Sequence, residues 1–301
     1  MTPLTFETEK SHLDRAGVLL ELERYPQALV ACDQALSLRP DSVEGLVTRA
    51  RVLIALRRYS EAERTALDAL KHDASHWFAM FLVARAVMLL EEYPRALTLF
   101  DQALVVCSQD ATSHVYRGIC LSNIGRRLDA VLAVEHALRL APNDATVLSN
   151  AARVLGSSNE ALRAEKLMVA ALAIAPNNAK YLRLLAWVRG RAGKDLQSEM
   201  VAREAVRQDP NSAQGWWTLG LAEWRLNRMP SAAHAMLEAM RLRPNDVDLL
   251  LDCADVLWRN GQGSHGLEVV AHALLVSPNH KRLLALQAQI AANPLQYAVR
   301  E

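Results

Sequence analysis

The sequence predicts an all-α protein built as an array of stacked helix pairs, and three periodic features carry this prediction. An alanine returns every 34 residues from Ala35 to Ala273, without drift in the spacing. A proline stands five residues after most of these alanines, and only Ala74 and Ser108 interrupt that row. Small residues occupy two further fixed places in each period. A period of about 20 to 50 residues indicates a repeat array, in which each repeat packs only on its neighbours.

The spacing divides the chain into eight repeats when the recurrent alanine is given repeat position 27. The repeats then run over residues 9–42, 43–76, 77–110, 111–144, 145–178, 179–212, 213–246 and 247–280, after an N-terminal extension of residues 1–8. We expect residues 281–301 to form a capping helix and a tail, because Leu284 and Ala288 continue the register. Such a helix would cover the last apolar face of the array, although a self-association surface is the alternative.

Each repeat is expected to contain two helices. Positions 8 and 20 hold Ala, Gly or Ser in every repeat, so the helix backbones can approach closely while larger residues at positions 4, 11, 24 and 28 fill the gaps. In five repeats the turn between the helices carries Gly125, Asn159, Gly193, Asn227 or Gly261, and these residue types tolerate a left-handed helix end. The proline near the end of the repeat then stops the second helix, because proline cannot continue a helix.

Composition and charge exclude several classes of partner and compartment. The 34 Lys and Arg residues balance the 33 Asp and Glu residues to a net charge of +1, which gives no general field for nucleic acid or anionic membranes. The four cysteines form no CxxC pair, so neither a zinc site nor a disulfide framework is indicated, and free cysteines fit a reducing compartment. Residues 1–10 show no apolar core of a signal peptide, and no apolar run could span a membrane. We therefore expect a cytoplasmic protein that is not inserted into a membrane.

No motif in the sequence indicates catalysis. HExxH, GxxxxGK[ST] and GxSxG are absent. His72 and His76 have the spacing of two metal ligands on one helix face, but they straddle a predicted turn, so a solvated loop is the favoured interpretation. Asp248, Asp252 and Asp255 share one helix face, yet nothing nearby completes a coordination shell, which favours an acidic patch over a metal site. We expect no enzyme activity, no cofactor and no metal.

The pattern resembles the tetratricopeptide repeat family over all eight repeats. The small residue at position 8, alanine at positions 20 and 27 and proline at position 32 carry the resemblance, with Trp216 at the family's tryptophan position 4. The family's aromatic residue at position 17 is matched by Tyr25, Tyr59 and Tyr93. The departures from the pattern are Arg15, Arg49 and Arg117 at position 7 and non-aromatic residues such as Asp195 and Gly263 at position 17. The resemblance implies a right-handed α-solenoid of antiparallel helix pairs, whose first helices line a concave groove.

The groove is where the resemblance places partner contacts. Its candidate residues, at repeat positions 2, 5, 6, 9 and 12, are Arg51, Phe78, Phe81, Arg85, Tyr116, Asn150, Arg153, Lys180, Arg183, Trp187, Trp217, Trp224 and Trp258. Tryptophan and arginine are the residues most enriched in binding hot spots. Arginines predominate in repeats 2 to 5, aromatic residues join them in repeats 6 to 8, and the acidic patch lies at the far end. We expect an extended segment that is anionic opposite the arginines and apolar opposite the tryptophans; rings packed between first helices and a solvated arginine face are the alternatives.

The resemblance implies a non-enzymatic scaffold or adaptor that binds a protein or peptide, as bacterial members do in secretion, envelope and toxin–immunity systems. The alternatives are a self-assembling homo-oligomeric scaffold and a recruiting or regulatory subunit of an enzyme in another chain. The family's two-carboxylate clamp for chaperone C-termini is matched only by Asn150 and Lys180. Val115, Ile119 and Leu184 stand where that clamp needs polar or basic residues, so chaperone-tail capture is not favoured.

Overall fold

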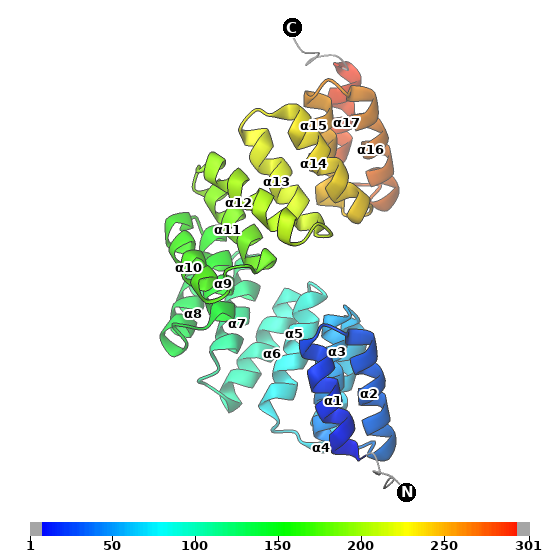
Figure 1. Cartoon of the computed structure of the whole chain (residues 1–301), viewed down its shortest axis with the longest axis vertical. Helices are drawn as coiled ribbons and strands as arrows, with labels where there is room; N and C mark the ends of the chain where they lie inside the picture. The colour runs from blue at the N-terminus through cyan, green and yellow to red at the C-terminus, as the bar shows by residue number, and fades with distance from the viewer. Residues whose placement is uncertain (1–7, 294–301) are drawn as a thin grey trace, which may run out of the picture. The chain divides into compact units, whose positions relative to one another are not determined.

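The computed structural model describes residues 8–293, and this part of the chain contains seventeen α-helices and no β-strand (Figure 1). The first helices of successive pairs are α1 (Glu9–Glu21), α3 (Val43–Ala55), α5 (Trp77–Leu89), α7 (Ala111–Asn123), α9 (Ala145–Ser157), α11 (Ala179–Arg191), α13 (Ala213–Arg225) and α15 (Val247–Arg259). The second helices are α2 (Tyr25–Leu38), α4 (Tyr59–His72), α6 (Tyr93–Val106), α8 (Arg127–Leu140), α10 (Ala161–Ile174), α12 (Asp195–Gln208), α14 (Met229–Leu242) and α16 (Gly263–Val276), and α17 spans Lys281–Ala292. The predicted all-α stack of helix pairs is confirmed.

The helices are consistent with eight pairs followed by one terminal helix. This last helix, α17, buries Leu283, Leu286 and Ile290 in the same apolar core as residues of α15 and α16. The boundaries of the eight repeats within the turns stay a prediction, and most of the N-terminal extension and of the tail lies outside the described residues.

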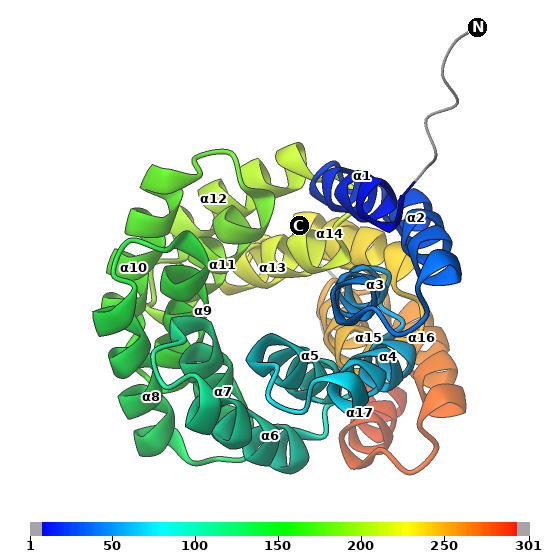
Figure 2. The same cartoon turned by 90° about the horizontal axis from the view of Figure 1, so that it is seen from below.

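The chain forms two compact units, residues 1–142 with helices α1 to α8 and residues 143–301 with helices α9 to α17. We call them the N-terminal half and the C-terminal half. Within each half every helix packs on the next one in sequence, and first helices also contact one another, as α3 does with α5 and α11 with α13. Among the described residues, no two second helices are comparably close. The first helices therefore lie on the inner side of each half, as α5 and α7 do relative to α6 and α8, and α9 and α11 relative to α10 and α12 (Figure 2).

Each first helix begins at a side chain that caps it. The capping residue accepts a hydrogen bond from a backbone N–H in the first turn, for example Ser42 Oγ from Gly45 at 3.1 Å and His76 Nδ1 from Ala79 at 3.1 Å. The full row is Thr8, Ser42, His76, Asp110, Asp144, Asn178, Ser212, Asp246 and His280. A cap satisfies one of the free N–H groups at a helix start, so this row fixes where every first helix starts. It also gives His76 a structural role at the turn where the pair His72 and His76 stood out in the sequence.

The small residues lie where the helices touch. Every residue at positions 8, 20 and 27 is buried. A Cβ added to Gly118 would lie 2.8 Å from Val134 Cγ1, and one added to Gly266 would lie 3.1 Å from the carbonyl oxygen of Ala254. At another such position, Ser198 donates a hydrogen bond to the carbonyl oxygen of Ala186 at 2.7 Å. Larger side chains at these positions would hold the helices apart, which explains the strict period.

The turn between the two helices has a left-handed residue in all eight repeats. Five of these residues are the predicted glycines and asparagines, such as Gly125 with a φ of 84° and Asn159 with a φ of 67°. The other three are Glu23, Arg57 and Glu91, with φ of 56°, 60° and 66°. A side chain with a Cβ is disfavoured there by about 1–2 kcal/mol. The first three repeats therefore hold the turn against a local steric penalty.

We expect Arg57→Gly to raise the free energy of unfolding by about 0.5–1 kcal/mol, because glycine adopts this φ without a steric penalty and part of the gain is lost to the greater entropy of the unfolded chain. The Arg57 side chain is exposed and makes no ion pair among the described residues, so little else changes. Urea denaturation followed by circular dichroism measures the effect. Arg64→Gly, at an exposed position inside α4, is the control and should lower stability by about 1 kcal/mol. An equal loss of stability in both variants would contradict the steric penalty that we assign to Arg57.

Candidate functional site

In the N-terminal half, most of the predicted groove aromatics form a packed column between helices. The Phe78 ring stacks on Phe81 with centroids 5.6 Å apart, Phe81 lies 5.7 Å from Tyr116, and Phe100 of α6 stacks on Tyr116 at 6.0 Å. Phe81 and Tyr116 are buried, whereas Phe78 is half-buried. The expectation that Phe81 and Tyr116 offer open surface to a partner is therefore corrected, because both rings fill the space between α5, α6 and α7.

Two predicted arginines of this half differ in their surroundings. The guanidinium carbon of Arg85 lies 5.6 Å from the ring centroid of Tyr116, so Arg85 covers the end of the aromatic column in a cation–π contact. Arg51 is exposed on α3, and no described residue forms an ion pair with it. Of the predicted groove residues in this half, Arg51, Arg85 and part of Phe78 remain open to a partner.

The inner face of the C-terminal half begins with a group of cations. Arg153 is exposed and donates a hydrogen bond to Asn150 Oδ1 at 3.1 Å, and Lys180 is exposed on the next first helix. Arg183 is half-buried beside them, and no carboxylate among the described residues pairs with it. Burial lowers the pKa of the Arg183 guanidinium, and the charges of Arg153 and Arg243 lower it further. An anion placed here would relieve that repulsion.

Four tryptophans follow along the inner face, and they are not equivalent. The Trp187 ring packs over Gly156 of α9, where an added Cβ would lie 2.6 Å from the ring. Trp217 donates from Nε1 to Asp252 Oδ2 at 2.9 Å, and the Arg259 guanidinium lies 5.6 Å from the Trp224 ring centroid. These three rings are half-buried. Trp258 is buried, and its Nε1 donates to the carbonyl oxygen of Asn293 at 2.9 Å, so its predicted role as an open contact is corrected.

The predicted acidic patch is tied to its neighbours. Asp255 accepts a hydrogen bond from Arg259 Nε at 2.9 Å, and Asp248 is exposed. Burial raises the pKa of the Asp252 carboxyl; the Trp217 hydrogen bond and Arg282 oppose the rise, whereas Asp248 and Asp255 add to it. The described residues contain no cluster of three or more His, Cys, Asp or Glu side chains placed to hold a metal ion. Asp252 of this patch therefore orients the indole of Trp217 through its hydrogen bond.

Two family models match the sequence, and both describe a tetratricopeptide repeat, over residues 19–80 and 183–247. The chain is a tetratricopeptide repeat protein. Proteins with these repeats are generally protein-binding scaffolds and typically non-catalytic, and the matching models include no enzyme family. None of the curated proteins matches the sequence. No described helix combines the length and the apolar character needed to cross a bilayer.

Solved structures share the fold at low sequence identity. A chain of the APC/C hetero-tetramer Cut9-Hcn1 is 15% identical with a TM-score of 0.74, and the match covers 93% of this protein and 55% of that chain. This protein therefore spans about half the length of that relative. A tetratricopeptide repeat protein from Parabacteroides merdae is 12% identical with a TM-score of 0.62, covering 83% and 98% of the two chains. The Thermus thermophilus protein TTC0263 is 20% identical with a TM-score of 0.54, covering 60% and 99%. At these identities the likeness concerns the fold alone.

The raised pKa of Asp252 leads to a test of stability against pH. Because the carboxyl has a higher pKa folded than unfolded, its ionisation costs stability, and the cost develops as pH rises from about 4 through the folded pKa. We expect Asp252→Asn, which keeps an acceptor for Trp217, to be more stable than the wild type at pH 7 and equal to it at pH 3. Thermal melts across this range measure the difference. Asp101→Asn, which removes the partner of Arg117, should instead lower stability at pH 7. A gain for Asp252→Asn that persists unchanged at pH 3 would refute the explanation.

Proposed function

We propose that this protein is a non-enzymatic adaptor that holds an extended segment of a partner protein on the inner face of its first helices. The general role of the family supports this class of function. The observation that carries the proposal is Arg183, a half-buried cation that has no carboxylate partner among the described residues and lies close to Arg153 and Arg243. A partially desolvated charge without a counter-charge is costly, and a carboxylate of the partner would compensate it.

The neighbours of Arg183 define the kind of segment that fits. Trp187 lies four residues further along α11 and therefore on the same side of the helix. The half-buried ring of Trp217 follows on α13, which contacts α11. Aromatic rings of this kind form the centres of binding hot spots. We infer a segment with acidic residues opposite α9 and the start of α11 and with apolar residues opposite α11 and α13. An enzyme that carried such a segment would make this protein its recruiting subunit.

Self-association is a second candidate, and the first helix pair supports it. Four large apolar side chains are more than half exposed on α1, its C-terminal cap and α2: Val18, Leu22, Val30 and Leu38. Exposed apolar residues on neighbouring helices are typical of protein interfaces. Mass measured by light scattering over a range of concentrations distinguishes a monomer from an oligomer, and Leu22→Glu with Val30→Glu should return an oligomer to monomers.

The adaptor proposal is tested by reversing the exposed cations of the inner face. We expect Arg153→Glu with Lys180→Glu to weaken partner binding by at least about tenfold, because two like charges would then face the acidic segment. Both side chains are exposed, so the fold should survive. Capture from native lysate with mass spectrometry identifies the partner, and titration with the purified partner gives the affinities.

The matched control makes the same change of charge on second helices, through Lys166→Glu on α10 and Arg207→Glu on α12. Both of these side chains are also exposed. A partner that the inner-face variant loses and the control variant retains supports the proposal. A partner that both variants bind as tightly as the wild type places recognition elsewhere and refutes it.

A further inference from the structure

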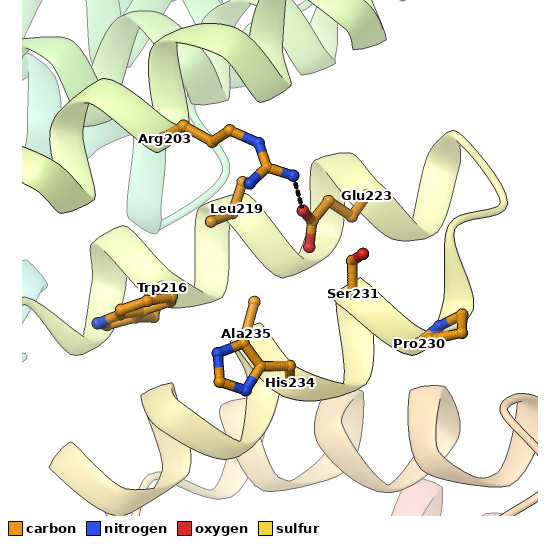
Figure 3. Close-up of a pocket in the computed structure, with 8 residues that line it drawn as sticks. All are labelled: Arg203, Trp216, Leu219, Glu223, Pro230, Ser231, His234 and Ala235. Carbon is orange, nitrogen blue, oxygen red and sulfur yellow. Dashed lines mark hydrogen bonds and ion pairs between the residues drawn. The ribbon is translucent and has the colours of Figure 1, made fainter.

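A pocket of about 450 Å³ opens on the other side of the C-terminal half, between the second helices α12 and α14 (Figure 3). Its floor is one side of α13, with Trp216, Leu219 and Glu223, and Arg203 of α12 and His234 of α14 stand at its edges. A volume of this size lies within the range of about 300–1,000 Å³ that ligand pockets occupy. The pocket is separate from the inner face, and the following inference does not rest on the proposed function.

Glu223 is unusual for its place in the repeat. It occupies position 11, which holds Leu or Val in six of the eight repeats and is charged only at Arg189 and Glu223. Its side chain is buried, with 2% of the residue exposed. A carboxylate removed from water costs several kcal/mol unless ionic and hydrogen-bonding partners compensate it. The partners of Glu223 therefore decide what the pocket can do.

Glu223 shares with Glu199 the one arginine that forms an ion pair with it among the described residues. Arg203 donates from Nη2 to Glu223 Oε1 at 2.6 Å, and the same guanidinium donates from Nε to the buried Glu199. Arg228 lies 3.6 Å from Glu199 and forms no ion pair with Glu223. Burial raises the pKa of the Glu223 carboxyl; Arg203 opposes the rise, Glu199 adds to it, and the charges of Arg228 and His234 also oppose it.

The second oxygen of Glu223 lacks a donor. No described group donates a hydrogen bond to Oε2, and Figure 3 shows this oxygen turned away from Arg203 toward α14. Glu165 on α10 provides a contrast within the same half, because it accepts from Arg189 on one oxygen at 3.0 Å and from Lys194 on the other at 2.6 Å. Burial alone would raise the pKa of Glu165, but these two cations outweigh it and the pKa is lowered. Glu223 differs from Glu165 because, among the described residues, only one of its two oxygens accepts a hydrogen bond from a cation.

The rest of the pocket suits an aliphatic chain. Trp216 is held by a hydrogen bond from Nε1 to the carbonyl oxygen of Pro210 at 2.9 Å, and its ring meets His234 edge-on with centroids 6.0 Å apart. Trp216, Leu219 and Glu223 follow one another along one side of α13 over two turns, a span of about 10 Å. Lysine and arginine place an apolar stem behind a cationic head, so the stem can lie on Leu219 and Trp216 while the head meets the carboxylate.

We propose that this pocket receives a lysine or arginine side chain of a partner protein, whose head donates a hydrogen bond to Oε2 of Glu223 while its stem lies against Trp216 and Leu219. An acidic group would meet two buried carboxylates, and a neutral donor would leave Glu223 with no cation other than Arg203, which it shares with Glu199. The charge of the site therefore selects a cation.

The test uses the ¹⁵N-labelled full chain and three blocked amino acids, N-acetyl-lysine methylamide, N-acetyl-arginine methylamide and the uncharged N-acetyl-norleucine methylamide. The Trp216 indole resonance, assigned from its loss in Trp216→Phe, reports on the pocket. We expect a saturable shift with at least one cationic probe and an affinity for it at least about tenfold above that for norleucine. Glu223→Gln should remove this preference, whereas Glu165→Gln should keep it.

A second measurement does not depend on the variants. The carboxyl carbon of Glu223 is titrated in the wild-type chain with and without the lysine probe, and a bound cation should lower its pKa against the opposing influence of Glu199, with Arg203, Arg228 and His234 unchanged. Equal affinities for norleucine and the cationic probes, an unchanged preference in Glu223→Gln, or no saturable shift with any probe would each overturn the proposal.

Discussion

The close approach of helix backbones at small residues is the constraint on which the structure depends. Positions 8, 20 and 27 hold only Ala, Gly or Ser, and at Gly118 and Gly266 even a methyl group would meet a neighbour. Because packing of this density leaves no room for larger side chains, the period cannot drift without separating the helices. The remaining surface positions are released from this constraint. They vary from repeat to repeat, and this variation distinguishes one binding surface from another.

Charges inside the stack show where the C-terminal half departs from a uniform array. The layer that is filled by leucine or valine elsewhere contains Arg189 in one repeat and Glu223 in the next. Glu165 is fully compensated by two cations, so its burial has a structural explanation. Glu223 shares its ion-pair partner Arg203 with Glu199, which also lies 3.6 Å from Arg228, and no described group donates to the second oxygen of Glu223. A buried carboxylate that lacks full compensation costs stability in the free protein, and a cation bound beside it would recover part of that cost.

The architecture could be predicted from the sequence because small residues, mainly alanine, recur wherever two helix backbones pack closely. Their spacing therefore gives the repeat length directly. The sequence also predicted the left-handed turn where Gly or Asn stands, but Glu23, Arg57 and Glu91 adopt the same conformation without a residue type that signals it. The repeat position of each groove residue correctly places it on a first helix. It does not predict whether the side chain is exposed, because that depends on which neighbouring side chains cover it. Tyr116 is covered by Phe100 of the preceding second helix, and Trp258 is held by Asn293. Glu223 was missed, although a charge at a position occupied by leucine in other repeats was a usable signal.

Arg183 and Glu223 in the C-terminal half each lack a full counter-charge, and the charges that would compensate them are opposite. The two residues lie on different sides of the helix stack. Adjacent residues of α13 point to different sides, since Trp217 donates to Asp252 of the next first helix whereas Trp216 lines the pocket between second helices. One short segment cannot supply an anion to Arg183 and a cation to Glu223 at once. Exposed charges such as Arg153 and Lys180 are screened by salt far more than a buried carboxylate. The inner face should therefore mainly determine the association rate constant and its salt dependence. The pocket should mainly determine the dissociation rate constant.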